Sequence, residues 1–285
     1  MPFVAAAAQF SPIKGALEAN LDRISIIARK AVDEGADLCV FPESSISGYV
    51  LEGGAVECSM TPAQLESGLR NRLDGLKKPV DLLVGFYESH SGQPYNSAAY
   101  FDSQRGVIHV YRKFFLPTYG VFDEERFHSR GTALGIVDSR LGRFGILICE
   151  DVWHSILADL CVVAGADMLL VPSASPVRGM ANDKPGNLLR YERMLKGLAE
   201  EHGVYALASM LTGSEGGKCF SGGSMIFDPF GELLVQCPVG EEALVLAEID
   251  FDNVQIARTK TPLVGDLKSA WANVQSIVSQ IAPSE

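Results

Sequence analysis

The sequence has 285 residues, of which 47% are hydrophobic, so it can bury a large core. A net charge of -11 and scattered basic residues argue against a nucleic-acid partner and favour a small-molecule substrate. The N-terminus has no basic n-region and turns polar at Gln9, and no apolar run approaches the roughly 20 residues that span a bilayer. We therefore expect a cytoplasmic protein without a membrane partner.

Strand and helix patterns alternate from the N-terminus. A strand over residues 3–10 is followed by an amphipathic helix over 16–34 and by the strand DLCVFPE. The same order recurs in residues 154–175, HSILADLCVVAGADMLLVPSAS. In both copies a glycine, Gly35 or Gly165, suits the left-handed residue just past a helix end. Short helix-to-strand turns of this kind are typical of layered α/β folds.

Antiparallel hairpins fill the rest of the chain. Residues 80–88 and 95–113 predict strands, with a turn at Asp-Ser-Gln-Arg-Gly. A helix over 186–202 precedes a strand over 204–210, a hairpin over 222–237 and a last strand over 242–250. This mixture predicts two sheets flanked by helices in one domain, residues 1–258. Residues 259–285 form a predicted arm that packs on the domain or on a partner subunit.

Three apolar strands end on residues that a core would not favour: Glu43, Lys113 and Cys149. Strand ends in layered α/β folds converge on one crevice, so an acid, an amine and a thiol could meet there. A thiolate that attacks a carbonyl carbon needs a base for its proton and a cation for the oxyanion. The set therefore indicates covalent acyl transfer, although each residue alone is more often structural.

The two acids after Cys149 raise a difficulty, because negative charge suppresses a thiolate. Lys113 offsets their field in part. A helix predicted to begin at Glu150 would place the thiol near a helix N-terminus, which favours negative charge. On their own, Glu150 and Asp151 read equally well as charges that complement a helix terminus.

Other candidates are weaker. His128 and His154 fit satisfied polar or surface histidines better than acid-base groups. A metal site made of Cys149, Asp151 and His154 is crowded, and the wide spacing of the six cysteines gives no zinc or disulfide pattern. Residues 180–185, MANDKP, predict a loop that shapes the pocket near Ser175.

Five segments, in order, resemble the nitrilase or carbon-nitrogen hydrolase superfamily over residues 3 to about 250. FPESSISGY, YRKFFLPTYGVFDEERF and GILICEDVW match its three signatures, and GADMLLVPSASP and FSGGSMIFDPFGELL match later motifs. The resemblance implies a four-layer α-β-β-α sandwich, a Glu43–Lys113–Cys149 triad and no metal or organic cofactor. It also implies a second glutamate, which falls on Glu124, with the adjacent Glu125 as the alternative.

Within the superfamily, YGVFDEERF and LICEDVW are most similar to the glutamine-hydrolysing domain of bacterial NAD synthetases. This similarity implies substrate contacts at five positions: Tyr49, Tyr119, Glu150, Trp153 and Ser175. The sequence shows no ATP-binding synthetase domain or phosphate-binding glycine-rich loop. We therefore expect no fused domain to receive ammonia, but a separate partner chain could still receive it.

These inferences predict hydrolysis of a small non-peptide amide through a thioester on Cys149, with release of ammonia, as in a glutaminase or ω-amidase. Glu43 would act as base, Lys113 and a backbone N–H near Glu150 would hold the oxyanion, and Glu150 would meet a substrate amine. The alternatives are an N-carbamoyl amine amidohydrolase, a true nitrilase, and a binding module that keeps the fold without activity. The resemblance and the predicted arm favour a homodimer or a larger homo-oligomer.

Overall fold

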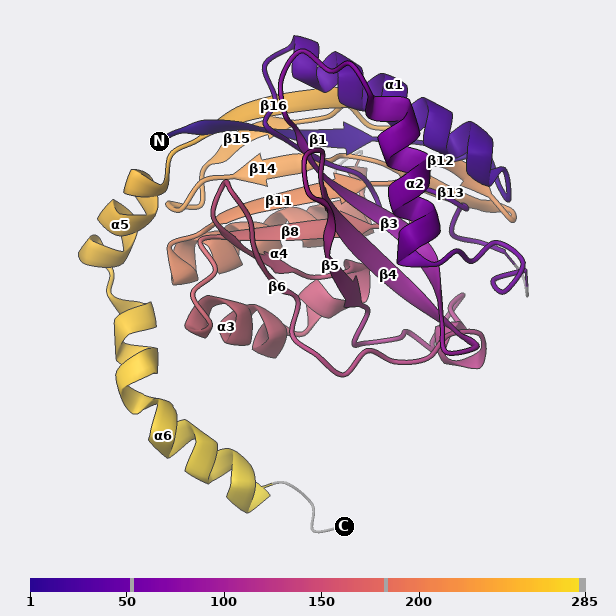
Figure 1. Cartoon of the computed structure of the whole chain (residues 1–285). Helices are drawn as coiled ribbons and strands as arrows, with labels where there is room; N and C mark the ends of the chain where they lie inside the picture. The colour runs from indigo at the N-terminus through magenta and orange to yellow at the C-terminus, as the bar shows by residue number, and fades with distance from the viewer. Residues whose placement is uncertain (52–53, 182–183, 282–285) are drawn as a thin grey trace.

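The computed structural model describes residues 1–51, 54–181 and 184–281, and two six-stranded sheets form its centre (Figure 1). The first sheet has the order β16-β1-β2-β3-β4-β5, with bounds β1 Phe3–Gln9, β2 Leu38–Val40, β3 Asp81–His90, β4 Gln93–Asp102, β5 Gly106–Arg112 and β16 Ala243–Ile249. The second has the order β15-β14-β11-β8-β7-β6, with bounds β6 Ile136–Asp138, β7 Arg143–Ile146, β8 Met168–Ser173, β11 Tyr205–Met210, β14 Met225–Phe227 and β15 Leu233–Gln236.

Helices cover the outer face of each sheet. The first sheet is covered by α1 (Leu17–Asp33) and α2 (Pro62–Leu73), the second by α3 (Ser155–Val163) and α4 (Gly186–His202). Alternate strand residues, such as Ala5 and Ala7 of β1, pack between the two sheets in a shared apolar layer. The predicted α-β-β-α sandwich is therefore confirmed.

The repeated helix-to-strand turn is confirmed in both copies. Gly35 and Gly165 have φ angles of +99° and +97°, the left-handed conformation that glycine adopts without a steric penalty. β1, β2 and β3 run parallel, as do β7, β8 and β11. The ends of β2 and β8 therefore deliver residues 43 and 174 to the same region between the sheets.

Two local predictions were wrong. The helix expected from Glu150 is a 3₁₀ helix, η2 (Cys149–Trp153), separated from α3 by His154, which has an extended backbone with ψ +93°. The His154 ring stacks on Phe115 at 3.7 Å between centroids. The loop expected at 180–185 contains two short paired strands, β9 (Met180–Ala181) and β10 (Lys184–Pro185); positions 182–183 lie outside the described residues.

A hairpin and two helices lie outside the two sheets and the four helices that cover them. The hairpin β12 (Thr212–Glu215) and β13 (Lys218–Ser221) lies between the 48–50 loop and the segment after β8. Beyond β16, α5 (Phe251–Lys260) leads to α6 (Leu263–Ile281), which buries only Val264 of its own described residues and extends past α3 (Figure 1). None of the described helices is both long and apolar enough to cross a membrane.

Candidate active site

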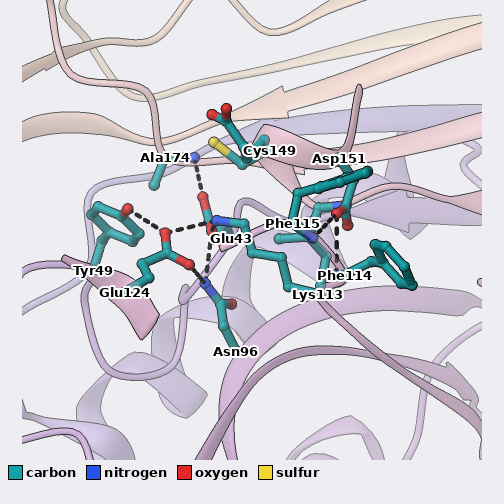
Figure 2. Close-up of polar contacts among 12 residues, drawn as sticks. Glu43, Tyr49, Asn96, Lys113, Phe114, Phe115, Glu124, Cys149, Asp151 and Ala174 are labelled. Carbon is teal, nitrogen blue, oxygen red and sulfur yellow. Dashed lines mark hydrogen bonds and ion pairs between the residues drawn. The ribbon is translucent and has the colours of Figure 1, made fainter. Parts of the chain in front are cut away.

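Glu43 follows β2 and points between the two sheets. Its Oε1 accepts hydrogen bonds from Lys113 Nζ at 2.7 Å and Asn96 Nδ2 at 2.8 Å, and its Oε2 accepts one from the Ala174 N–H at 2.8 Å (Figure 2). Its backbone lies directly against β3 at Gly85, where a Cβ atom would stand 2.7 Å from Glu43 Cα. The side chain is 1% exposed, and burial raises the pKa of this carboxyl group, an effect that the Lys113 charge partly opposes.

Lys113 has no exposed surface and lies between two carboxyl groups. Its Nζ donates to Oε1 of Glu43 and to Oε1 of Glu124, both at 2.7 Å. The residue follows β5, and its N–H donates to the carbonyl of Asn96 on β4. Burial alone lowers the pKa of Lys113, but attraction to the two glutamates outweighs this and raises it well above its usual value. The ammonium therefore stays charged.

The second glutamate beside Lys113 is Glu124, the first residue of a 3₁₀ helix, η1 (Glu124–Arg126). Its Oε1 also accepts a hydrogen bond from the Tyr49 hydroxyl at 2.5 Å. Glu125 instead pairs with Arg130 and leaves 46% of its side chain exposed. The structure thus brings Glu124 rather than Glu125 to the site, while the catalytic role of Glu124 stays a prediction.

Cys149 opens the 3₁₀ helix η2 with a φ angle of +49°, a left-handed conformation that costs a residue with a Cβ about 1–3 kcal/mol. Figure 2 shows its sulfur above the Glu43 carboxylate. The Sγ atom also lies 3.4 Å from the Tyr191 hydroxyl. Burial and the Glu43 charge raise the pKa of Cys149 well above its usual value, although Lys113 opposes them. The resting thiol is therefore neutral.

Asp151 does not face the thiol. Its carboxylate accepts hydrogen bonds from the N–H groups of Phe114 and Phe115 at 3.1 and 2.8 Å (Figure 2). It accepts further bonds from the Tyr111 hydroxyl and the Ile148 N–H. Burial raises the pKa of Asp151 to about 7, while these hydrogen bonds lower it.

The predicted substrate residues divide into two groups. Tyr119 donates its hydroxyl to both Glu150 oxygens, at 2.9 and 3.0 Å, and Trp153 lies in the same region, beside Arg178. Tyr49 and Ser175 form the second group, because their hydroxyls are hydrogen-bonded within the protein. The Tyr49 hydroxyl donates to Glu124, and the Ser175 hydroxyl accepts from Asn187 at 3.0 Å. For Tyr49 and Ser175 the structure favours support of the site over direct polar contact with a substrate.

Three residues that contribute to the site were missed at the sequence level: Asn96, Tyr191 and Arg178. Asn96 interrupts an apolar strand pattern, which is a usable signal for an inward-facing polar group. Tyr191 and Arg178 carry no such signal, because a tyrosine on a helix and an arginine in a loop are both ordinary. The Arg178 guanidinium carbon lies 5.2–5.8 Å from the ring centroids of Phe122, Trp153 and Tyr119.

The histidines lie outside the charged cluster. His128 is 9% exposed and stacks on Tyr87 at 4.5 Å between centroids, and burial lowers its pKa to about 4. His154 Nε2 is 3.8 Å from Glu150 Oε1. The part of the chain that the structure describes contains no cluster of three metal-ligating side chains. The hydrogen bonds to both Asp151 oxygens also leave that carboxylate poorly suited to a metal.

A cavity of about 160 Å³ borders the site on the Tyr49 side. Its described lining includes Tyr49, Phe122, Glu124 and His128 but not Cys149. The cavity therefore adjoins the second glutamate. On the thiol side, Trp153 packs on Tyr191, whose hydroxyl lies beside Cys149 Sγ.

Comparison with known proteins identifies the family, because the model for carbon-nitrogen hydrolases matches residues 4–259. The chain belongs to the carbon-nitrogen hydrolase family. This confirms the resemblance drawn from the five sequence segments, and with it the prediction of an enzyme superfamily that acts on carbon-nitrogen bonds.

Two of this hydrolase's relatives bear on its chemistry. It is 31% identical over 253 residues to the glutamine-dependent NAD(+) synthetase of Acinetobacter baylyi, covering 88% of this chain and 44% of that protein. The chain thus spans less than half the length of this curated relative. A structure of the Nesterenkonia sp. AN1 amidase, a mutant with acrylamide added at its active-site cysteine, has 25% identity and a TM-score of 0.71, covering 90% of this chain and 97% of that one.

A third comparison concerns the fold of this hydrolase. A carbon-nitrogen hydrolase from Helicobacter pylori G27 is 21% identical, with a TM-score of 0.84 over 96% of this chain and 98% of that one. This likeness supports the four-layer sandwich and says nothing of substrate.

Proposed function

We propose that this protein hydrolyses the amide group of a small molecule through a thioester on Cys149 and releases ammonia. The observation that carries the proposal is the buried charge cluster, in which Lys113 Nζ lies 2.7 Å from both Glu43 and Glu124 beside the thiol. Burying charged groups is costly. A binding module that kept this fold without activity would have no reason to keep two acids and an amine buried together.

In the first half-reaction, Cys149 Sγ forms a bond to the amide carbon while its proton passes to the Glu43 carboxylate. The carbonyl oxygen becomes an oxyanion, which Lys113 and a backbone N–H near Glu150 stabilise. When the C–O double bond re-forms, the C–N bond breaks, and Glu43 returns the proton to the leaving nitrogen. The products are ammonia and a thioester on Cys149.

In the second half-reaction, water attacks the thioester carbon as Glu43 removes one of its protons. Collapse of the tetrahedral intermediate breaks the C–S bond, and Glu43 returns the proton to sulfur, which regenerates the thiol and the carboxylate. Glu124 accepts a second hydrogen bond from Lys113, in addition to the one that Glu43 accepts, so the ammonium stays fixed through both steps.

The substrate class follows from two opposite charges near the thiol. Glu150 is 8% exposed. Arg178 is exposed to solvent and packs against the rings of Phe122, Trp153 and Tyr119, with no carboxylate within ion-pair distance among residues 1–51, 54–181 and 184–281. The Glu150 carboxylate could bind an α-amino group and the Arg178 guanidinium an α-carboxylate. An amino acid with an ω-amide carries both groups. The glutamine dependence named for the Acinetobacter relative supports glutamine as the first candidate. N-carbamoyl amines and nitriles are the alternatives, since the same residues can attack either.

The test is ammonia release from glutamine, other ω-amides, N-carbamoyl amines and nitriles. We expect turnover of an ω-amide, loss of turnover in Cys149→Ala, and an acyl adduct on Cys149 by mass spectrometry. The matched control is Cys161→Ala, the same change at another buried cysteine, which should retain turnover. Turnover by Cys149→Ala at the wild-type rate would refute the mechanism, and inactivity of the wild type on every compound would favour the binding-module alternative.

We also propose a homodimer or larger homo-oligomer in the cytoplasm. Beyond Val264, which packs in the chain's own core, five apolar residues of α6 follow a heptad spacing, which suits pairing with a second helix: Leu267, Trp271, Val274, Val278 and Ile281. Val278 and Ile281 are 52% and 74% exposed. All six cysteines are free, in keeping with a reducing compartment.

A further inference from the structure

Asp151 is the second acid after the proposed nucleophile, and the proposed chemistry does not use it. Its side chain has no exposed surface, and each carboxylate oxygen accepts two hydrogen bonds. Oδ1 accepts from the N–H groups of Phe114 and Phe115, at 3.1 and 2.8 Å. Oδ2 accepts from the Tyr111 hydroxyl at 2.8 Å and the Ile148 N–H at 3.0 Å. A carboxylate with this set of partners is not available to a substrate.

The four donors come from two chain segments, one at the end of β5 in the first sheet and one after β7 in the second. Tyr111 and Phe114 flank Lys113, which follows β5 of the first sheet, whereas Ile148 precedes Cys149, which follows β7 of the second. Figure 2 shows Asp151 beside the chain segment that leaves Lys113. One carboxylate therefore ties the backbone of the proposed cation to the backbone of the proposed nucleophile.

The Cys149 turn needs such a restraint. Its φ angle of +49° is unfavourable for a residue with a side chain, and conformations of this kind persist only where neighbouring contacts determine them. The hydrogen bond from the Ile148 N–H fixes the peptide unit just before the turn. We propose that Asp151 is a positioning residue that sets the placement of the Cys149 thiol relative to Lys113. The inference rests on the proposed hydrolysis.

The substitution Asp151→Asn separates the two halves of this restraint. An asparagine oxygen can still accept from Phe114 and Phe115, but its NH₂ group would face the Ile148 N–H, a donor against a donor. The hydrogen bond from Ile148, next to Cys149, is therefore lost, while the bonds from Phe114 and Phe115, next to Lys113, remain. We expect kcat to fall about 100-fold, the size of effect that a misplacement near 1 Å produces, with KM changed less than about threefold.

The matched control is Asp81→Asn. Asp81 is equally buried and also accepts a tyrosine hydroxyl at 2.8 Å, from Tyr100, but it opens β3 and does not contact the site. This variant should lose stability and keep the kcat of its folded fraction. Equal kcat values in Asp151→Asn and wild type would overturn the positioning role, as would an equal fall of kcat in both variants. An inactive wild type would instead count against the proposed function.

Hydrogen exchange on the wild-type protein tests the same inference if Asp151→Asn does not fold. The amides of Phe114, Phe115 and Ile148 lie outside the strands, and within the described part of the chain the Asp151 carboxylate is their hydrogen-bond acceptor. We expect them to exchange as slowly as amides within β7 and β8. Exchange at the rate of an exposed loop would show that the carboxylate does not restrain these segments.

Discussion

At the scale of single residues, Lys113 shows how the site is assembled. A fully buried ammonium is stable only because two carboxylates lie 2.7 Å away, and each carboxylate in turn depends on the ammonium. Removing Lys113 leaves two buried carboxylates without a cation. The cost therefore falls on folding as well as on catalysis.

The substitution Lys113→Met should destabilise the protein by about 3–5 kcal/mol, the usual cost of breaking a buried ion pair, and should abolish ammonia release. Denaturant unfolding and the amide assay measure the two effects. Lys77→Met is the control, because Lys77 pairs with Asp33 while 79% of its side chain is exposed, so its loss should leave both unchanged. Wild-type stability in Lys113→Met would contradict the buried charge cluster.

The proposed role of Glu43 as the base predicts how activity depends on pH. The base must be ionised to take the thiol proton, and burial raises its pKa above the ordinary value of 4.5. As the pH falls, kcat/KM should therefore start to drop at a pH higher than an exposed glutamate would produce. A pH profile of kcat/KM for the wild type checks this. A flat profile down to pH 4.5 would show that Glu43 is not the base.

At the scale of elements, β3 supports the turn that carries Glu43. A Cβ atom at Gly85 would lie 2.3 Å from the Pro42 carbonyl oxygen and 2.6 Å from the Ser44 nitrogen, so the strand and the turn would have to separate. Glycine is thus required by the close approach of two backbones.

The substitution Gly85→Ala should lower kcat about 100-fold by displacing Glu43. Gly197→Ala in α4 makes the same chemical change where nothing lies within 4 Å, and it should stabilise the helix by about 0.5–1 kcal/mol with kcat unchanged. Thermal unfolding and kcat are the two measurements. A wild-type kcat in Gly85→Ala would show that the turn tolerates the shift.

Sequence patterns predict the elements better than their junctions. Strand ends at Glu43, Lys113 and Cys149 could be read because an acid, an amine or a thiol interrupts an apolar run. The 3₁₀ helix after Cys149 could not, because the Asp151 carboxylate that shapes it bonds to residues nearly 40 positions away. Arg178 and Tyr191 were missed for the same reason, since their importance lies in partners distant in sequence.

At the scale of the whole molecule, α6 leaves an apolar stripe exposed. In the proposed dimer, Val278 and Ile281 would be buried against a second copy of the chain, so charging them should prevent association. The double substitution Val278→Asp and Ile281→Asp should therefore give a monomer in analytical ultracentrifugation, while Gln280→Asp, a change at a neighbouring polar position, should leave a dimer. A monomeric wild type would contradict the proposal.

The hydrogen bond from the Ala174 N–H to Glu43 has a consequence for the whole sandwich. Glu43 follows β2 of the first sheet and Ala174 follows β8 of the second, so the orientation of the proposed base depends on how the two sheets are aligned. A substitution deep between the sheets, such as one at Leu170, can thus change the rate without touching the site, by sliding one sheet over the other. If Glu43 is the base, as proposed, a state with only one sheet formed would lack the Ala174 hydrogen bond that orients it.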